Sequence, residues 1–111
     1  MSISFGSGGG FTGAYNEFIL NGKGNLSSIK AFTSDTSLIK KIDNKTLKKI
    51  FKALESKAIK NTTLNQSGNM NSFIKFYSNN KLIHSYQWAD GAIPPQEIKD
   101  LYQTLNTLTQ P

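Results

Sequence analysis

The sequence predicts an α+β protein: an antiparallel sheet of about five strands with two helices packed on one face, in the order β-β-β-(β)-α-β-β-α. Two hairpin turn signals, each between apolar stretches, predict the sheet. Two segments with apolar residues at helical spacing predict the helices. Hairpins joined in this way favour an antiparallel sheet with helices on one side. The 111 residues suit a single domain, 1–111, with one core.

Three or four strands are expected before the first helix. Ile3–Phe5 is short, and Ala14–Leu20 and Leu26–Phe32 flank the turn sequence Asn21–Gly24. Leu38–Ile42 is either one more short strand or an extended lead-in to the helix.

The first helix has a clear start and a clear apolar stripe. Asp43 is a suitable N-cap, and Ile42 and Leu47 have the spacing of a hydrophobic staple. The stripe consists of Leu47, Ile50, Phe51, Leu54 and Ala58. Four lysines fall mostly on the other side, which favours a solvated helix face over a binding patch: Lys45, Lys48, Lys49 and Lys52.

The second half is predicted to contain a loop, a hairpin and a helix. Asn61–Asn71 is polar and is expected to be a loop. Phe73–Tyr77 and Leu82–Trp88 flank Asn79-Asn80, two residues that tolerate the left-handed conformations of tight turns. Pro94 and Pro95 open the last helix, where a missing N–H costs nothing. Its stripe is Ile98, Leu101, Tyr102, Leu105 and Leu108.

The amino-acid composition indicates which classes of partner and which cell compartments suit the chain. The net charge is +6, but all 13 basic residues are lysine, and arginine makes most bidentate nucleic-acid contacts, so no nucleic-acid partner is expected. No apolar run approaches the ~20 residues of a membrane span. Without cysteine, the chain suits the cytoplasm, and it suits a bacterial cell envelope equally, with a lipid anchor if a signal was removed.

A glycine-rich segment stands out near the start. Gly8, Gly10 and Gly13 match a dinucleotide-binding spacing, but a strand is expected to follow where that motif needs a helix. The segment from Gly6 is expected to have no regular structure. It is either a wide turn or a backbone-rich tip that enters a partner's cleft, and the second interpretation makes these candidate binding residues: Gly8, Gly9, Gly10, Phe11, Thr12 and Gly13.

Residues suited to catalysis are sparse, so the chain is not expected to be an enzyme. His84 is the one histidine and is expected to be structural, and no nucleophile motif accompanies it. No metal site and no cofactor are predicted. Aromatic residues in the second hairpin suit either the core or a binding surface. Tyr86 and Trp88 are therefore also candidate binding residues.

Two stretches resemble the emfourin-like group of small bacterial proteins, which includes inhibitors of thermolysin-like metallopeptidases. They are Gly9-Gly10-Phe11-Thr12-Gly13 and the segment from Ile93 to Leu105, with its Pro-Pro start and leucine repeat. The likeness runs from about Ile3 to about Leu108 and extends to uncharacterised, lysine- and asparagine-rich Bacteroidetes-type proteins. It implies a protein inhibitor without a cofactor, and a metallopeptidase as the partner. Phe11 would be the apolar anchor of the loop.

Three hypotheses follow. The first is a protease inhibitor that acts through Gly8–Gly13. The second is an envelope-associated binding module for a protein or a glycan, which predicts a lipoprotein signal and a cysteine directly upstream in the reading frame. The third is a small enzyme or nucleic-acid binder that uses His84 or the face of Lys45–Lys52.

Overall fold

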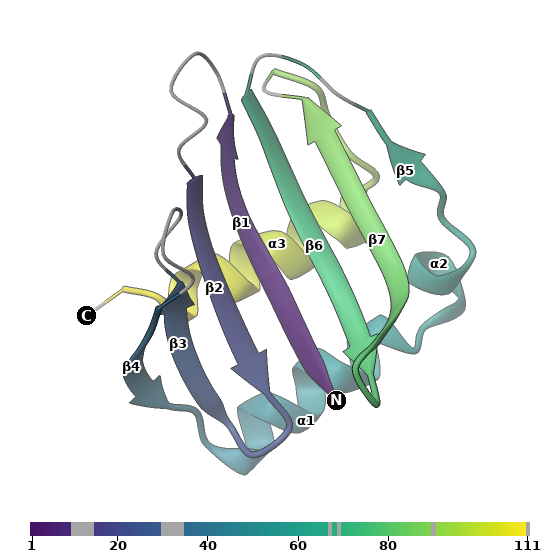
Figure 1. The fold of residues 1–111 in the computed structure, drawn as a ribbon. Coiled ribbons are helices and arrows are strands. Elements are labelled where there is room, and N and C mark those ends of the chain that lie inside the picture. The colour runs from purple at the N-terminus through teal and green to yellow at the C-terminus, as the bar shows by residue number, and fades with distance from the viewer. Residues whose placement is uncertain (10–14, 30–34, 67, 69, 90, 111) are drawn as a thin grey trace.

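A computed structural model describes residues 1–9, 15–29, 35–66, 68, 70–89 and 91–110. In this part of the chain, helices lie against one face of a single mixed sheet, and the other face carries no helix (Figure 1). None of these helices combines the length and the apolar character needed to cross a membrane. The elements are β1 (Ser2–Gly9), β2 (Tyr15–Asn21), β3 (Asn25–Ile29), β4 (Thr36–Lys41), α1 (Asn44–Leu54), α2 (Lys57–Lys60), β5 (Leu64–Asn65), β6 (Met70–Ser78), β7 (Lys81–Ala89) and α3 (Gln96–Leu108).

The sheet has the strand order β4-β3-β2-β1-β6-β7-β5. The α+β class and the two hairpins are confirmed, and the optional strand before the helix is present as β4. The prediction of about five strands, all antiparallel, is wrong in detail because the described residues form seven strands and β5 pairs with β7 in parallel. The sequence gives little sign of β5, which lies in a polar stretch. The residue after β5, Gln66, connects it to β7. Its backbone N–H donates to the carbonyl of Gln87 at 2.9 Å, and the side-chain amide of Gln87 donates to the carbonyl of Gln66 at 3.0 Å.

β1 is the central strand, and it is longer than predicted. The sequence predicts no regular structure from Gly6 onward, but Gly6–Gly9 continue β1. Gly6, Ser7 and Gly8 pair with both β2 and β6, and Gly9 pairs with β6. Hydrogen bonding on both sides outweighs the low strand propensity of glycine, which depends strongly on context. Gly6 also suits a close approach between strands, because an added Cβ there would lie 1.9 Å from the carbonyl oxygen of Asn16.

α1 begins as the sequence predicts. The carboxylate of Asp43 accepts hydrogen bonds from the backbone N–H of Thr46 at 3.1 Å and from its hydroxyl at 2.8 Å. The helix ends at Leu54, earlier than the stripe to Ala58 predicts. Ser56 then starts α2, since its hydroxyl accepts from the N–H of Ile59 at 3.4 Å. The one expected helix is therefore two.

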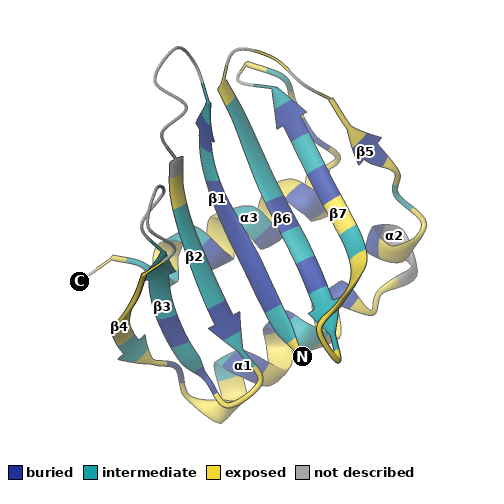
Figure 2. Cartoon of the chain, in the orientation of Figure 1, coloured by how far each residue is buried: buried dark blue, intermediate teal, exposed yellow. Residues whose placement is uncertain are grey.

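The core lies between the sheet and the helices. α3 contributes the apolar stripe that the sequence predicts, and α1 contributes its stripe as far as Leu54. The central strands contribute alternate residues. The largest fully buried side chains are Tyr86, Phe5, Ile3, Leu20, Leu26, Leu54, Ile74, Ile98 and Leu105. Figure 2 shows this burial concentrated in β1 and its neighbours, while β4 at the edge is exposed. Helix packing thus accounts for one face of the sheet and leaves the other accessible.

Candidate functional site

A strip of small residues runs along the middle of the helix-free face. Ile3 and Phe5 of β1 are buried in the core beneath the helices. Because side chains alternate along a strand, Ser4, Gly6 and Gly8 face the other side. The strip has almost no side-chain bulk, so its neighbours on β2 and β6 stand higher than it does.

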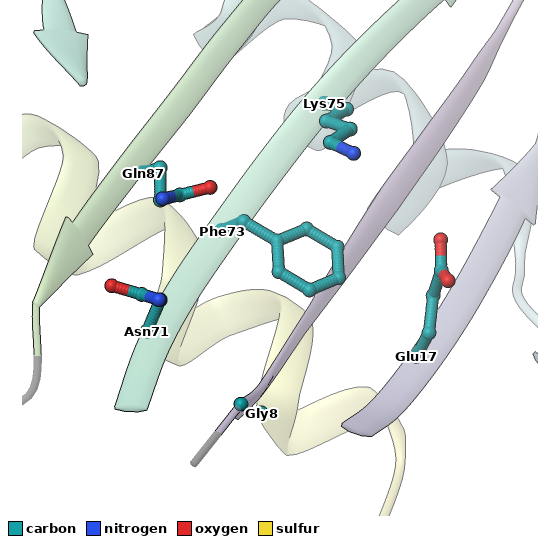
Figure 3. Close-up of a pocket in the computed structure, with 7 residues that line it drawn as sticks. Gly8, Glu17, Asn71, Phe73, Lys75 and Gln87 are labelled. Atoms are coloured by element: carbon teal, nitrogen blue, oxygen red, sulfur yellow. The ribbon is translucent and has the colours of Figure 1, made fainter. Parts of the chain in front are cut away.

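A hollow forms where this strip meets those neighbours. Gly6 pairs with Glu17 of β2 on one side and with Phe73 of β6 on the other. Figure 3 shows the ring of Phe73 directed from β6 toward β1 and Glu17 rising from β2 on the far side. The hollow has a volume of about 240 Å³ and is lined by Gly8, Gly9, Glu17, Asn71, Phe73, Lys75 and Gln87.

The lining combines opposite charges, amides and one aromatic ring. The hydroxyl of Ser4 donates a hydrogen bond to the carboxylate of Glu17, which fixes that side chain beside the strip. The ammonium of Lys75 lies 5.3 Å from the centre of the Phe73 ring, within cation–π range. Asn71 and Gln87 add amide donors and acceptors. The hollow can therefore bind a polar chain by hydrogen bonds and pack an apolar group against Phe73.

The predicted binding segment meets this hollow at one end. Gly8 and Gly9, the last residues of β1, line it. Gly9 has a φ of 115°, a conformation open to glycine and strained for other residues. Gly10, Phe11, Thr12 and Gly13 lie outside the described residues.

Tyr86 and Trp88 lie in the core, on the helix side of the sheet and away from the hollow. Tyr86 is 1% exposed and Trp88 is 6% exposed. The hydroxyl of Tyr86 donates to the carbonyl of Ile59 at 2.7 Å, and the Trp88 ring packs edge-on against Tyr102 at 5.0 Å. Expecting them at the site was wrong because their strand parity turns them toward the helices. They fix α2 and α3 to the sheet instead.

His84 also lies among aromatic side chains. Its ring lies 6.4 Å from that of Phe76 and 6.1 Å from that of Tyr86, so it packs between two aromatic neighbours on the helix side. Among the described residues, no three side chains of His, Cys, Asp or Glu gather closely enough to hold a metal ion.

Most residues of the hollow were missed by sequence reasoning. Phe73 and Lys75 alternate with Ile74 and Phe76, and Ile74 and Phe76 are buried in the core. This alternation alone places Phe73 and Lys75 on the opposite face. Glu17 and Gln87 join them only because β2 and β7 flank the central pair of strands.

Comparison with known proteins gives no family for this chain. No protein-family model matches the sequence, and no curated protein matches it.

Proposed function

We propose that this protein is a non-enzymatic protein-binding domain that binds its partner through the hollow on the helix-free sheet face. The proposal rests on the shape of that face, on which large side chains stand on both sides of a strip of small residues. Phe73 and Tyr77 on β6 and Ile19 on β2 are half-buried large side chains on either side of the Gly and Ser strip. A rigid sheet that presents an aromatic anchor beside a hollow is suited to a protruding loop or an extended segment of another protein.

The specific candidate partner is a thermolysin-like metallopeptidase, as the resemblance to emfourin-like proteins implies. Its support here is the continuity between the hollow and the glycine segment. β1 ends at Gly9 on the rim of the hollow, and the chain proceeds directly to Gly10–Gly13. A rigid strand that leads into the segment would lower the entropy lost when the segment enters a cleft. In this proposal Phe11 is the apolar anchor that the resemblance implies, and Phe73 is the aromatic residue of the hollow.

An inhibition assay tests this proposal. The protein is titrated at micromolar concentration against a panel of thermolysin-like peptidases. Phe73→Ala is expected to weaken inhibition by roughly 30-fold, the effect of losing a binding hot spot of about 2 kcal/mol. Phe11→Ala is expected to weaken it without unfolding the protein.

The matched control is Ile93→Ala, which removes an exposed apolar side chain that is not part of the hollow. It should inhibit as the unaltered protein does. Fully active enzymes across the panel would refute the inhibitor proposal. If the Phe73 and Ile93 variants lost equal affinity, the hollow would not be the binding surface.

A second candidate is an envelope-associated module that binds a glycan. The lining of the hollow favours it, because an aromatic ring beside Asn71, Gln87 and Glu17 offers both an apolar face and several hydrogen-bonding groups for sugar hydroxyls. Calorimetric titration with soluble cell-wall oligosaccharides distinguishes the two candidates. Saturable binding that Phe73→Ala abolishes, with no peptidase inhibition, would favour the glycan.

A further inference from the structure

The whole net charge of the protein originates in one segment. Residues 40–60 contain eight lysines and two acidic residues, an excess of six that equals the net charge of the chain. The rest of the chain has five lysines and five acidic residues, so it is neutral. Such asymmetry creates a local positive potential and favours an anionic partner.

The topology gathers lysines from several elements at one end of the molecule. The chain start, the β2–β3 turn, the β6–β7 turn and α1 all lie at this end (Figure 1). Met1 marks the centre, since it lines one depression with Lys48 of α1 and another with Asn79 and Asn80 of the hairpin turn. The lysine-rich end, as defined here, carries the exposed side chains of Lys23, Lys41, Lys45, Lys48, Lys52 and Lys81.

Acidic residues do little to neutralise this end. Residues 40–60 contain only two acidic residues, Asp43 at the N-cap of α1 and Glu55 at its C-cap, against eight lysines. Lys49, by contrast, lines a groove with Glu97 and Asp100 of α3 and is excluded from the set. The lysine-rich end therefore keeps most of the positive charge of α1 facing outward.

Exposed aliphatic side chains lie among these lysines. Leu82 and Ile83 are 52% and 50% exposed, although they occupy consecutive positions in β7, and Met1 is 58% exposed. The register of β6 and β7 shifts between Phe76 and Tyr77, and this irregularity leaves Ile83 without a direct partner. A bulge of this kind redirects side chains away from the regular alternation. Two neighbouring aliphatic residues thus face solvent beside Lys81.

We propose that the lysine-rich end docks on the surface of an anionic lipid bilayer. Lysine ammonium groups are attracted to anionic headgroups, and short aliphatic side chains such as Leu82 and Ile83 insert at the boundary with the acyl chains. A nucleic acid fits this surface less well, because the chain has no arginine to make bidentate contacts with bases or phosphates. This proposal is independent of the hollow and its partner.

Vesicle co-sedimentation tests the proposal with the full chain. Vesicles of phosphatidylcholine alone are compared with vesicles containing about 30% phosphatidylglycerol, at about 50 and about 500 mM salt. The protein is expected to sediment with the anionic vesicles at low salt and to be released at high salt. Equal binding to both vesicle types, or none to either, would overturn the proposal.

Paired variants locate the surface. Lys48→Glu is expected to weaken partitioning onto anionic vesicles at least about fivefold, equivalent to roughly 1 kcal/mol for one basic residue near the membrane. Lys99→Glu makes the same charge change on α3, away from this end, and should change partitioning less than about twofold. Leu82→Ser combined with Ile83→Ser should weaken it roughly tenfold with all charges kept. If Lys99→Glu and Lys48→Glu had equal effects, general charge and not this surface would be responsible.

A competition experiment tests whether the lysine-rich end prefers an anionic polymer to the anionic bilayer. A short DNA duplex or an acidic polypeptide is added to the vesicle mixture at matched charge concentration. The protein should stay on the vesicles, because neither competitor accommodates the aliphatic side chains. Complete displacement by either competitor would show that the end binds that class of polymer in preference to lipid.

Discussion

The hydroxyl of Tyr102 in α3 donates a hydrogen bond to the backbone carbonyl of Gly6 in β1 at 2.9 Å. The two residues are 96 positions apart, so this bond connects the last helix to the first strand. The Tyr102 ring also packs edge-on against Trp88. Gly6 belongs to the strip of small residues that lies beneath the hollow. The hydrogen bond from Tyr102 therefore ties this part of β1 to α3 on the core side of the sheet.

Tyr102→Phe should lower the free energy of unfolding by about 1 kcal/mol, because it removes one hydrogen bond and keeps the ring. Tyr102→Ala should cost more, since it also removes the contact with Trp88. Urea unfolding at neutral pH measures both. An unchanged midpoint for Tyr102→Phe would mean that water replaces the hydroxyl without loss.

Gly6→Ala should destabilise the protein severely, by more than about 3 kcal/mol, because strands β1 and β2 would have to separate to admit a Cβ. The added atom would lie 1.9 Å from the Asn16 carbonyl oxygen. Gly22→Ala is the matched control, since its nearest neighbour, the Met1 carbonyl oxygen, is 3.3 Å away. Thermal unfolding compares the two. Similar midpoints would contradict the close approach of the two strands at Gly6.

Tyr86 is expected to make stability fall in alkali. Burial raises the pKa of Tyr86 above its ordinary value of 10.0. The unfolded chain therefore loses this proton at a lower pH than the folded chain does, and stability decreases as pH rises above about 10. Tyr86→Phe should remove this part of the decrease. It should also cost about 1–3 kcal/mol at neutral pH, because the buried carbonyl of Ile59 loses its donor. Urea unfolding of both proteins from pH 7 to 11 provides the check, and parallel curves would contradict it.

Asp43 should contribute to stability in the opposite pH range. The hydroxyl and backbone N–H of Thr46 hold the pKa of Asp43 below its ordinary value of 3.8. Its contribution is present above the unfolded pKa and is lost as pH falls through the folded one. Asp43→Asn keeps a capping oxygen but does not titrate. Melting temperatures between pH 2 and 6 should therefore fall more steeply for the unaltered protein than for this variant.

Of the residues that line the hollow, only Gly8 and Gly9 were predicted from the sequence as binding residues. Local pattern could also have placed Phe73. Alternation in the second hairpin separates Phe73 from Ile74, so the face of Phe73 follows from the sequence once one face is known to be core. Which face the helices cover depends on the tertiary packing. That choice buried Tyr86 and Trp88, which a local pattern leaves equally suited to the core or to a binding surface.

The sequence by itself determined the elements whose causes are local. The cap at Asp43, the turn at Asn79 and Asn80 with φ of 53° and 64°, and the proline-led start of α3 need only neighbouring residues. Tertiary structure decided the rest: that Gly6–Gly9 continue the central strand, and that β5 joins in parallel. It also brought Leu82 and Ile83 to the lysine-rich end. These outcomes depend on hydrogen bonds and packing between segments distant in sequence, and no local pattern encodes them.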